Sequence, residues 1–226
     1  MEKLRVELYN IDNMEFEANP ADLIFCDYVY ENLDFSWAEK YFHFLKPNGI
    51  MISMTDFHSN HRYRIFMEDK LKAIFVNELV WKNEWGNYKK DRFNQCYDSI
   101  IIYSNGKNWN FYPDRIQVPK VTNSKGLNPS GRKTKPATAW IDDVTLTTVA
   151  KERVKKKDGH LIKWQKPLRL YDRIIMPFTN EKDSILDPFM GSGSLGKWCM
   201  ENNRNYTGIE NDRTTFKLAT KNIFHT

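Results

Sequence analysis

The chain has 226 residues, of which 41% are hydrophobic and 28% charged, and its formal net charge is +5. This composition is typical of a soluble globular protein with one large domain, or with one domain that carries an insertion. No run of about 18 apolar residues is present, which predicts no membrane span, and the N-terminal segment lacks the apolar core of a signal peptide. The three cysteines are scattered without CxxC spacing, which argues against a disulfide framework or a cysteine zinc site and fits a reducing cytoplasm.

The first 103 residues alternate between strand and helix patterns. Apolar and β-branched runs predict strands at 4–9, 21–26, 50–54, 75–81 and 97–103. Aromatic and apolar residues at helical spacing predict helices at 35–45 and 61–74, and a Lys-Pro-Asn-Gly turn signal follows the first of them. This order is the βαβ rhythm of a mostly parallel sheet.

Residues 104–163 break that rhythm, because prolines and glycines recur and no periodic pattern persists. We expect an insertion with little regular structure, and insertions of that length are usually functional. Seven basic residues and one acid lie between positions 107 and 135, and a second basic run spans 151–157. One such run alone is typical of a solvated surface, whereas two runs beside a loop indicate a polyanionic partner.

Regular patterns resume with a predicted helix at 165–176, in which Pro167 suits the first turn. A short strand at 185–186, a glycine loop, a helix at 195–200 and a strand that ends on Glu210 follow. A last helix is predicted at 213–224, capped by Asn211 or Asp212.

The glycine loop fits more than one cofactor by spacing alone. Gly191, Gly193 and Gly196 form a GxGxxG pattern, and Glu210 lies 19 residues after Gly191, which is the dinucleotide fingerprint. The same stretch resembles a phosphate-binding loop, but Trp198 occupies the position where a magnesium-binding hydroxyl is required. A nicotinamide-dependent oxidoreductase therefore remains the rival enzyme.

Acidic residues around the loop favour a cofactor without phosphate. Asp187 enters the loop at the end of a strand, where it would repel a pyrophosphate. S-adenosylmethionine instead carries an ammonium group, which suits Asp187, and a ribose diol, which suits Glu210. The glycines allow close approach of the backbone.

Six sequence blocks carry a resemblance to the amino-methylating DNA methyltransferases. DPFMGSGS (187–194) resembles their DPFxGSGT motif, and ADLIFCDYVY (21–30) resembles their catalytic DLIxxDPPY segment. FLKPNGIMISMTD, LVWKNEW, RFNQCYDSIIIYS and QKPLRLYDRII are similar to further blocks of the family, in the order of its permuted β group.

The resemblance implies a Rossmann-like, S-adenosylmethionine-dependent α/β fold with a mostly parallel, seven-stranded sheet and permuted motif order. Residues 1–103 would form the catalytic half and 164–226 the cofactor-binding part, with 104–163 as the target-recognition insertion. The resemblance also implies a homodimer.

Catalytic roles follow from the same resemblance. Asp27 would accept a hydrogen from the target amine, and Tyr30 would stack on a base flipped out of the duplex. The family's Asp-Pro-Pro-Tyr is altered here to Asp27-Tyr28-Val29-Tyr30, so that packing must hold the turn. Three interpretations stay open: an active enzyme with an adapted turn, one in which Tyr28 shares the stacking, or a weak or inactive DNA-binding subunit.

Asp27 resembles the first residue of the family's adenine-N6 motif, whereas the cytosine-N4 motif more often begins with serine, so the resemblance implies adenine-N6. The candidate cofactor-binding residues are Asp12, Lys166, Asp187, Phe189, Gly191, Ser192, Gly193, Ser194 and Glu210. The candidate contacts to double-stranded DNA are Arg92, Lys125, Arg132, Lys133 and Lys135. No metal is expected, because Asp56, His58 and His61 lack a fourth ligand at sensible spacing.

Overall fold

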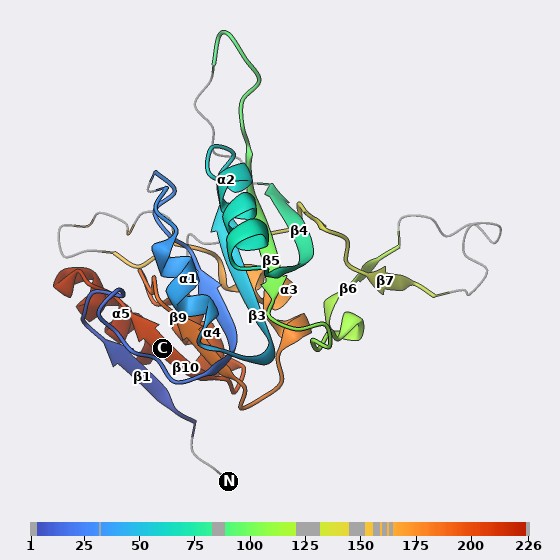
Figure 1. The fold of residues 1–226 in the computed structure, drawn as a ribbon. Helices are drawn as coiled ribbons and strands as arrows, with labels where there is room; N and C mark the ends of the chain where they lie inside the picture. Colours follow the sequence, from blue (N-terminus) through green and yellow to red (C-terminus); the bar gives the residue numbers. More distant parts are fainter. Residues whose placement is uncertain are drawn as a thin grey trace.

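The computed structural model describes residues 4–31, 33–82, 89–120, 132–144, 152–155, 159, 162 and 165–224. A central sheet of eight strands organises the molecule (Figure 1), with the order β1-β10-β9-β2-β3-β5-β4-β8. Its strands are β1 (Val6–Tyr9), β2 (Ala21–Cys26), β3 (Leu45–Thr55), β4 (Ile74–Lys82), β5 (Tyr97–Ser104), β8 (Trp140–Ile141), β9 (Ser184–Asp187) and β10 (Asn205–Ile209). Within this sheet β5 is antiparallel to both neighbours, and the other pairings are parallel.

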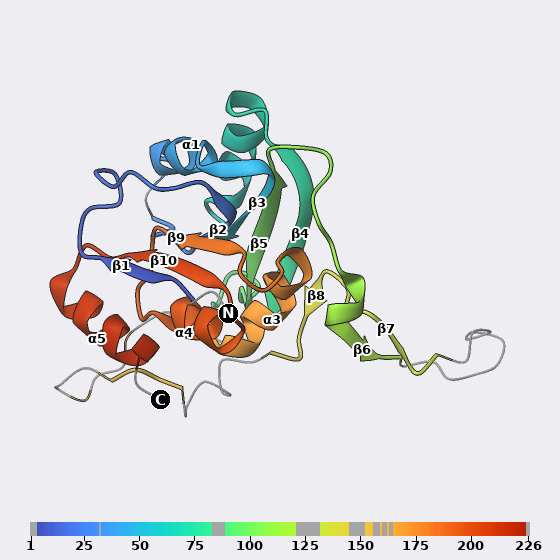
Figure 2. The same ribbon diagram turned by 90° about the horizontal axis from the view of Figure 1, so that it is seen from below.

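Helices cover both faces of the sheet, as Figure 2 shows. One face carries α1 (Ser36–Phe42), α2 (Asn60–Ile65) and the π-helical turn η1 (Phe66–Lys70); the other carries α3 (Leu168–Ile174), α4 (Ser194–Glu201) and α5 (Arg213–Phe224). Alternate residues of β2 feed the two resulting cores: Leu23 and Phe25 pack with α3 and α4, whereas Ile24 packs with α1 and η1. Burial on both faces explains why the central strands are almost continuously apolar.

The insertion contributes more regular structure than its sequence predicts. It contains the 3-10 turn η2 (Pro113–Ile116), the hairpin β6 (Gln117–Pro119) and β7 (Thr134–Pro136), and the edge strand β8. Because β8 pairs with β4, the sheet has one strand more than the expected seven. The β6–β7 hairpin projects from the side of the molecule (Figure 1).

Helix boundaries differ from the prediction at three places. The helix predicted at 35–45 ends at Phe42, and Leu45 already begins β3. The segment predicted as one helix at 61–74 divides into α2 and η1, and α3 begins only at Leu168, after Pro167, with the 3-10 turn η4 (Met176–Phe178) behind it. Asp212 caps α5, since its Oδ1 accepts a hydrogen bond from the Thr215 amide at 2.7 Å. No helix in the described ranges is long and apolar enough to cross a membrane.

Candidate functional site

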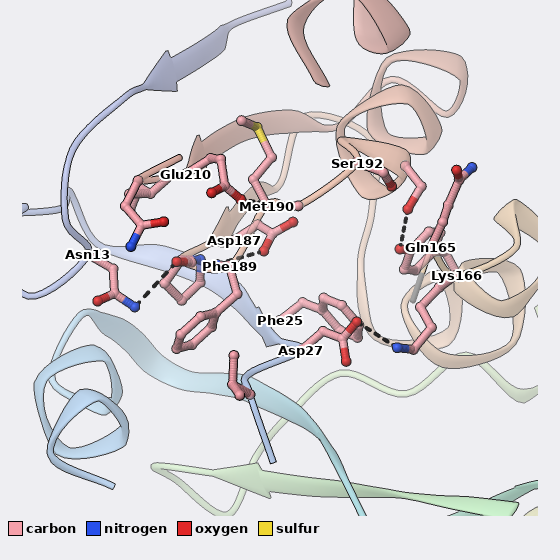
Figure 3. A pocket seen from close by; sticks show the side chains of 17 residues that line it. Asn13, Phe25, Asp27, Gln165, Lys166, Asp187, Phe189, Met190, Ser192 and Glu210 are labelled. Atoms are coloured by element: carbon pink, nitrogen blue, oxygen red, sulfur yellow. Dashed lines mark hydrogen bonds and ion pairs between the residues drawn. The ribbon is translucent and has the colours of Figure 1, made fainter. Parts of the chain in front are cut away.

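A cavity of about 360 Å³ opens at the carboxyl ends of β2, β9 and β10 (Figure 3). The crossover after β9 runs through α4 to β10, whereas the one after β2 runs through α1 to β3, so the chain departs in opposite directions here. Such a switch point is where open α/β sheets bind ligands. The register pairs Ile24 with Leu186, which brings Asp27 and Asp187 to the same cavity from adjacent strands.

The glycine loop wraps one side of this cavity in a backbone conformation that other residues rarely adopt. Gly191 and Gly193 have φ of 53° and 73°. A Cβ at Gly193 would lie 3.0 Å from the Ala219 carbonyl oxygen, and one at Gly196 would lie 2.6 Å from Ile223 Cδ1. The glycines therefore serve both the turn and the close packing of α4 on α5.

Glu210 ties the end of β10 to the glycine loop. Its Oε2 accepts a hydrogen bond from the Gly191 amide at 3.1 Å, and its Oε1 accepts one from the Asp212 amide at 2.9 Å. Burial raises the pKa of this carboxyl. Each oxygen keeps a lone pair for a further donor, as the two hydroxyls of a ribose would supply.

Asp187 is the most deeply buried acid in the cavity wall, with 2% of its surface exposed. The Tyr206 hydroxyl donates to its Oδ2 at 2.9 Å and the Phe189 amide donates to its Oδ1 at 3.2 Å. Burial nevertheless raises the pKa of Asp187 to about 7. A buried carboxylate that is this costly to ionise suits a cationic ligand, because an ammonium group would offset the lost hydration.

Asp27 receives two hydrogen bonds at the opposite wall. Lys166 Nζ donates to its Oδ2 at 2.6 Å, in an ion pair whose side chains are 6% and 19% exposed (Figure 3). The Tyr30 hydroxyl donates to its Oδ1 at 3.0 Å, and burial raises the pKa of Tyr30. The carboxylate is thus held from both sides, and Asp27 lines the cavity.

Tyr28 lies under the turn and not in the cavity wall. It is 4% exposed, and its ring lies 4.8 Å from that of Trp37 and 6.1 Å from that of Tyr63. Its hydroxyl donates to Ser59 Oγ at 3.0 Å. To share the stacking of a base, the ring would have to leave this cluster. Val29, 68% exposed, lines the cavity instead.

Most of the residues expected to bind the cofactor meet at this cavity. The wall contains Lys166, Asp187, Phe189, Gly191, Ser192, Ser194 and Glu210, while Gly193 shapes the loop behind it. Asp12 is exposed and its Oδ1 accepts a hydrogen bond from the Met14 amide, and its neighbour Asn13 lines the cavity. Lining residues that were not among the candidates are Asn13, Phe25, Val29, Gln165, Tyr171, Pro188, Met190, Ile209 and Asn211.

Two of these missed residues have clear structural partners. The Tyr171 hydroxyl and Ser194 Oγ are hydrogen-bonded at 2.8 Å. Gln165 donates to the Glu152 carbonyl and accepts from the Val154 amide, and so joins the end of the insertion to the cavity. Both lie in the block QKPLRLYDRII, whose resemblance to the family had singled out only Lys166.

The candidate DNA contacts lie on two surface segments. Arg92 is exposed in the connection between β4 and β5, where its guanidinium pairs with Asp91 at 2.8 Å. Arg132, Lys133 and Lys135 are exposed at β7. Lys125 lies outside the described residues. Over the part of the chain that the structure describes, no cluster of His, Cys, Asp or Glu could hold a metal ion.

Comparisons with known proteins agree with this geometry. The family described as DNA methylase (N6_N4_Mtase) matches residues 27–221. The type II methyltransferase M.HpaI of Haemophilus parainfluenzae is 30% identical over 92% of this chain and 69% of its own length. M.HinfI of Haemophilus influenzae is 26% identical over 88% of this chain, which spans only 53% of that protein.

Solved structures show the same fold. The M1.HpyAVI–SAM complex matches with a TM-score of 0.71 and 23% identity over 97% of this chain and 99% of that one. The cytosine-N4-specific PvuII DNA methyltransferase matches with a TM-score of 0.76 and 15% identity, over 98% and 87%. The buried carboxylate, the glycine loop and Glu210 fit the ammonium, backbone and ribose contacts that S-adenosylmethionine requires. The chain therefore belongs to the N6/N4 family of S-adenosylmethionine-dependent DNA methyltransferases, which methylate exocyclic amino groups.

Proposed function

We propose that this protein methylates the N6 atom of adenine in double-stranded DNA, acting on a base flipped into the cavity. The observation that carries the proposal is the Asp27 carboxylate, held by Lys166 and Tyr30 at the cavity wall opposite Asp187. An aspartate at this position favours adenine over cytosine. Cytosine-N4 remains the second candidate, because the PvuII enzyme specific for that atom shares the fold.

Asp27 has the chemistry that an exocyclic amine needs. The lone pair of such an amine is delocalised into the ring, so that it is a weak nucleophile. When Asp27 and a backbone carbonyl of the turn accept its two hydrogens, the lone pair is directed at the methyl donor. The cofactor supplies an electrophilic methyl group on a sulfonium. The nitrogen–carbon bond then forms as the carbon–sulfur bond breaks, and the Asp27 carboxylate lies where the released proton can be accepted.

The altered turn bears on whether the enzyme is active. In the absence of prolines, the Tyr28 ring and its bond to Ser59 support the backbone that carries Asp27. Ser59 is itself held, since its amide and Oγ donate to Asp56 Oδ1 at 2.8 and 2.6 Å. This support favours an active enzyme with an adapted turn over a binding subunit that kept the fold.

Binding to DNA would depend on the exposed basic residues of the β7 segment and of the β4–β5 connection. Lysine and arginine on phosphates supply affinity that falls with salt, and a few side chains supply base readout. We place the protein in the cytoplasm with its DNA. The homodimer implied by family resemblance stays a prediction, which analytical ultracentrifugation would check.

Incubation with labelled S-adenosylmethionine and plasmid DNA, followed by nucleoside analysis, tests the proposal. Labelled N6-methyladenine is expected, and labelled N4-methylcytosine would establish the second candidate. The variant Asp27→Ala should lose transfer and keep cofactor binding, whereas the control Glu201→Ala, an exposed carboxylate at the end of α4, should keep both. Cofactor binding without any methylated nucleoside would show a non-catalytic subunit. Binding of NAD in place of S-adenosylmethionine would favour the oxidoreductase.

A further inference from the structure

Phe93 is the most exposed large hydrophobic side chain among the described residues. Its relative exposure is 101%, compared with 68% for Val29, the next in order. Burial of an aromatic side chain lowers the free energy of a protein, and aromatic residues are enriched where proteins contact their partners, so we treat Phe93 as a candidate contact. Residues 89–92 before it read Lys-Lys-Asp-Arg, with three basic residues and one acid. This basic segment with an aromatic tip, residues 89–96, is called the arm below.

The arm rises from the edge of the sheet that carries Asp27. It leads into the amino end of β5, within the connection that follows β4, and Figure 1 shows it extending beyond the sheet at that edge. Cys26 pairs with Ser53, and Ser53 pairs with Ile101. Tyr97, where β5 begins, is therefore four residues, or about 13 Å, beyond the level of Cys26, and about 10 Å to its side across two strand spacings.

This position matches what a flipped base requires. DNA that delivers a nucleotide to the cavity must lie over the edge from which the arm extends. Flipping leaves a gap in the base stack, and proteins that distort DNA insert apolar side chains, phenylalanine among them, between base pairs. The lysines of the arm are suited to the flanking phosphates.

We propose that Phe93 inserts into the duplex beside the target nucleotide and occupies the space that the flipped base vacates. The arm is thus a DNA-contacting element separate from the β6–β7 hairpin, and its role is to promote flipping and not to read sequence. This inference rests on the proposed function, since it assumes that a base in duplex DNA enters the cavity.

The test compares Phe93→Ala with the native chain on oligonucleotides that carry the recognition sequence found by mapping methylated plasmid DNA. On a paired duplex, Phe93→Ala should lower the methylation rate about 10- to 100-fold. On the same duplex with a mismatch at the target, the base is already unstacked, and the difference should shrink to about threefold or less. Phe93→Trp should retain most of the rate. The matched control is Phe224→Ala, since Phe224 is 49% exposed at the end of α5.

A second measurement keeps the inference separate from the proposed function. With 2-aminopurine at the target position, binding of the native chain should increase fluorescence and Phe93→Ala should increase it less, whether or not methyl transfer follows. Equal fluorescence, or an equal loss of rate on paired and mismatched DNA, would refute the insertion of Phe93 into the duplex. It would not contradict the proposed methyltransferase activity. Loss of self-association by Phe93→Ala in ultracentrifugation would show that a second copy of the chain covers this residue instead. A native chain that methylates no DNA would contradict the proposed function.

Discussion

Replacing Asp187 by asparagine should make the protein more stable at pH 8 while removing its cofactor affinity. The pKa of Asp187 is about 7 in the folded chain, against 3.8 for an ordinary aspartate. Because the folded pKa is raised, the stabilisation is complete below pH 3.8 and is lost as the pH rises through about 7. Three pKa units at 1.36 kcal/mol each correspond to about 4 kcal/mol of lost unfolding free energy above pH 7.

Asparagine removes that cost with little change of shape. Its Oδ1 can keep the bond from the Phe189 amide, and the Tyr206 hydroxyl can turn to accept from the new amide. We expect Asp187→Asn to raise the free energy of unfolding at pH 8 by about 2–4 kcal/mol, where each kcal/mol corresponds to about 2–4 °C in melting temperature. Near pH 4 the two proteins should melt at similar temperatures.

Cofactor binding should respond in the opposite direction. Only the ionised Asp187 pairs with an ammonium group, and about one tenth of it is ionised at pH 6. The affinity of the native chain for S-adenosylmethionine should therefore fall about tenfold between pH 8 and pH 6, measured by calorimetry. Asp183→Asn is the control, because Asp183 is half-buried at the amino end of β9 and outside the cavity wall. An Asp187→Asn protein that is less stable at pH 8, or a native affinity independent of pH, would refute this reasoning.

Three further predictions concern other parts of the site. Lys166→Met should lower the single-turnover rate about 10–100-fold with unchanged cofactor affinity, because Asp27 would lose the ammonium group that holds its Oδ2 in position. Weaker cofactor binding at an unchanged rate would contradict this. Tyr28→Phe removes only the bond to Ser59, and should cost about 1 kcal/mol in urea unfolding, whereas Tyr28→Ala should cost about 3–5 kcal/mol; equal costs would argue against packing as the main support. Exchanging Lys133 and Lys135 for glutamate should reduce the slope of log Kd for DNA against log salt by about 0.9 per lost phosphate contact, and a slope that stays the same would remove β7 from the DNA surface.

The strands that carry the site could be predicted from the sequence, because their apolar patterns indicate strands. Asp27 and Asp187 were each predicted at the end of a strand, and both line the cavity because the carboxyl ends of neighbouring parallel strands share an edge. The contact of Lys166 with Asp27 was not accessible, because 139 residues separate them and the path of the intervening chain decides the contact. The eighth strand, β8, could not be predicted for a different reason, because two residues are too short to show a periodic pattern.

Tyr28 shows that a stronger inference was possible. Residues two apart on a strand share a face, and Ile24, Cys26 and Tyr28 all pack in the same core. Extending the alternation of β2 by one step would have placed Tyr28 inward, beneath the turn. The absence of prolines from the turn concerns the backbone alone. The side chain of Tyr28, which stands in place of the first proline, points into the core below the turn.

Because β2 pairs with β9, the geometry of the cavity does not depend on the order of these two strands in the sequence. These two strands lie side by side at the centre of the sheet and lead to Asp27 and Asp187, two of the three acids of the cavity, yet they are far apart in the sequence. The working geometry therefore depends on their lateral contact and not on which is translated first. A circularly permuted chain, with its original termini joined and new termini in another surface loop, should form the same cavity. If the chain were divided between β6 and β7, Asp27 and Asp187 would still meet in the cavity as long as the two fragments associated through the pairing of β2 with β9.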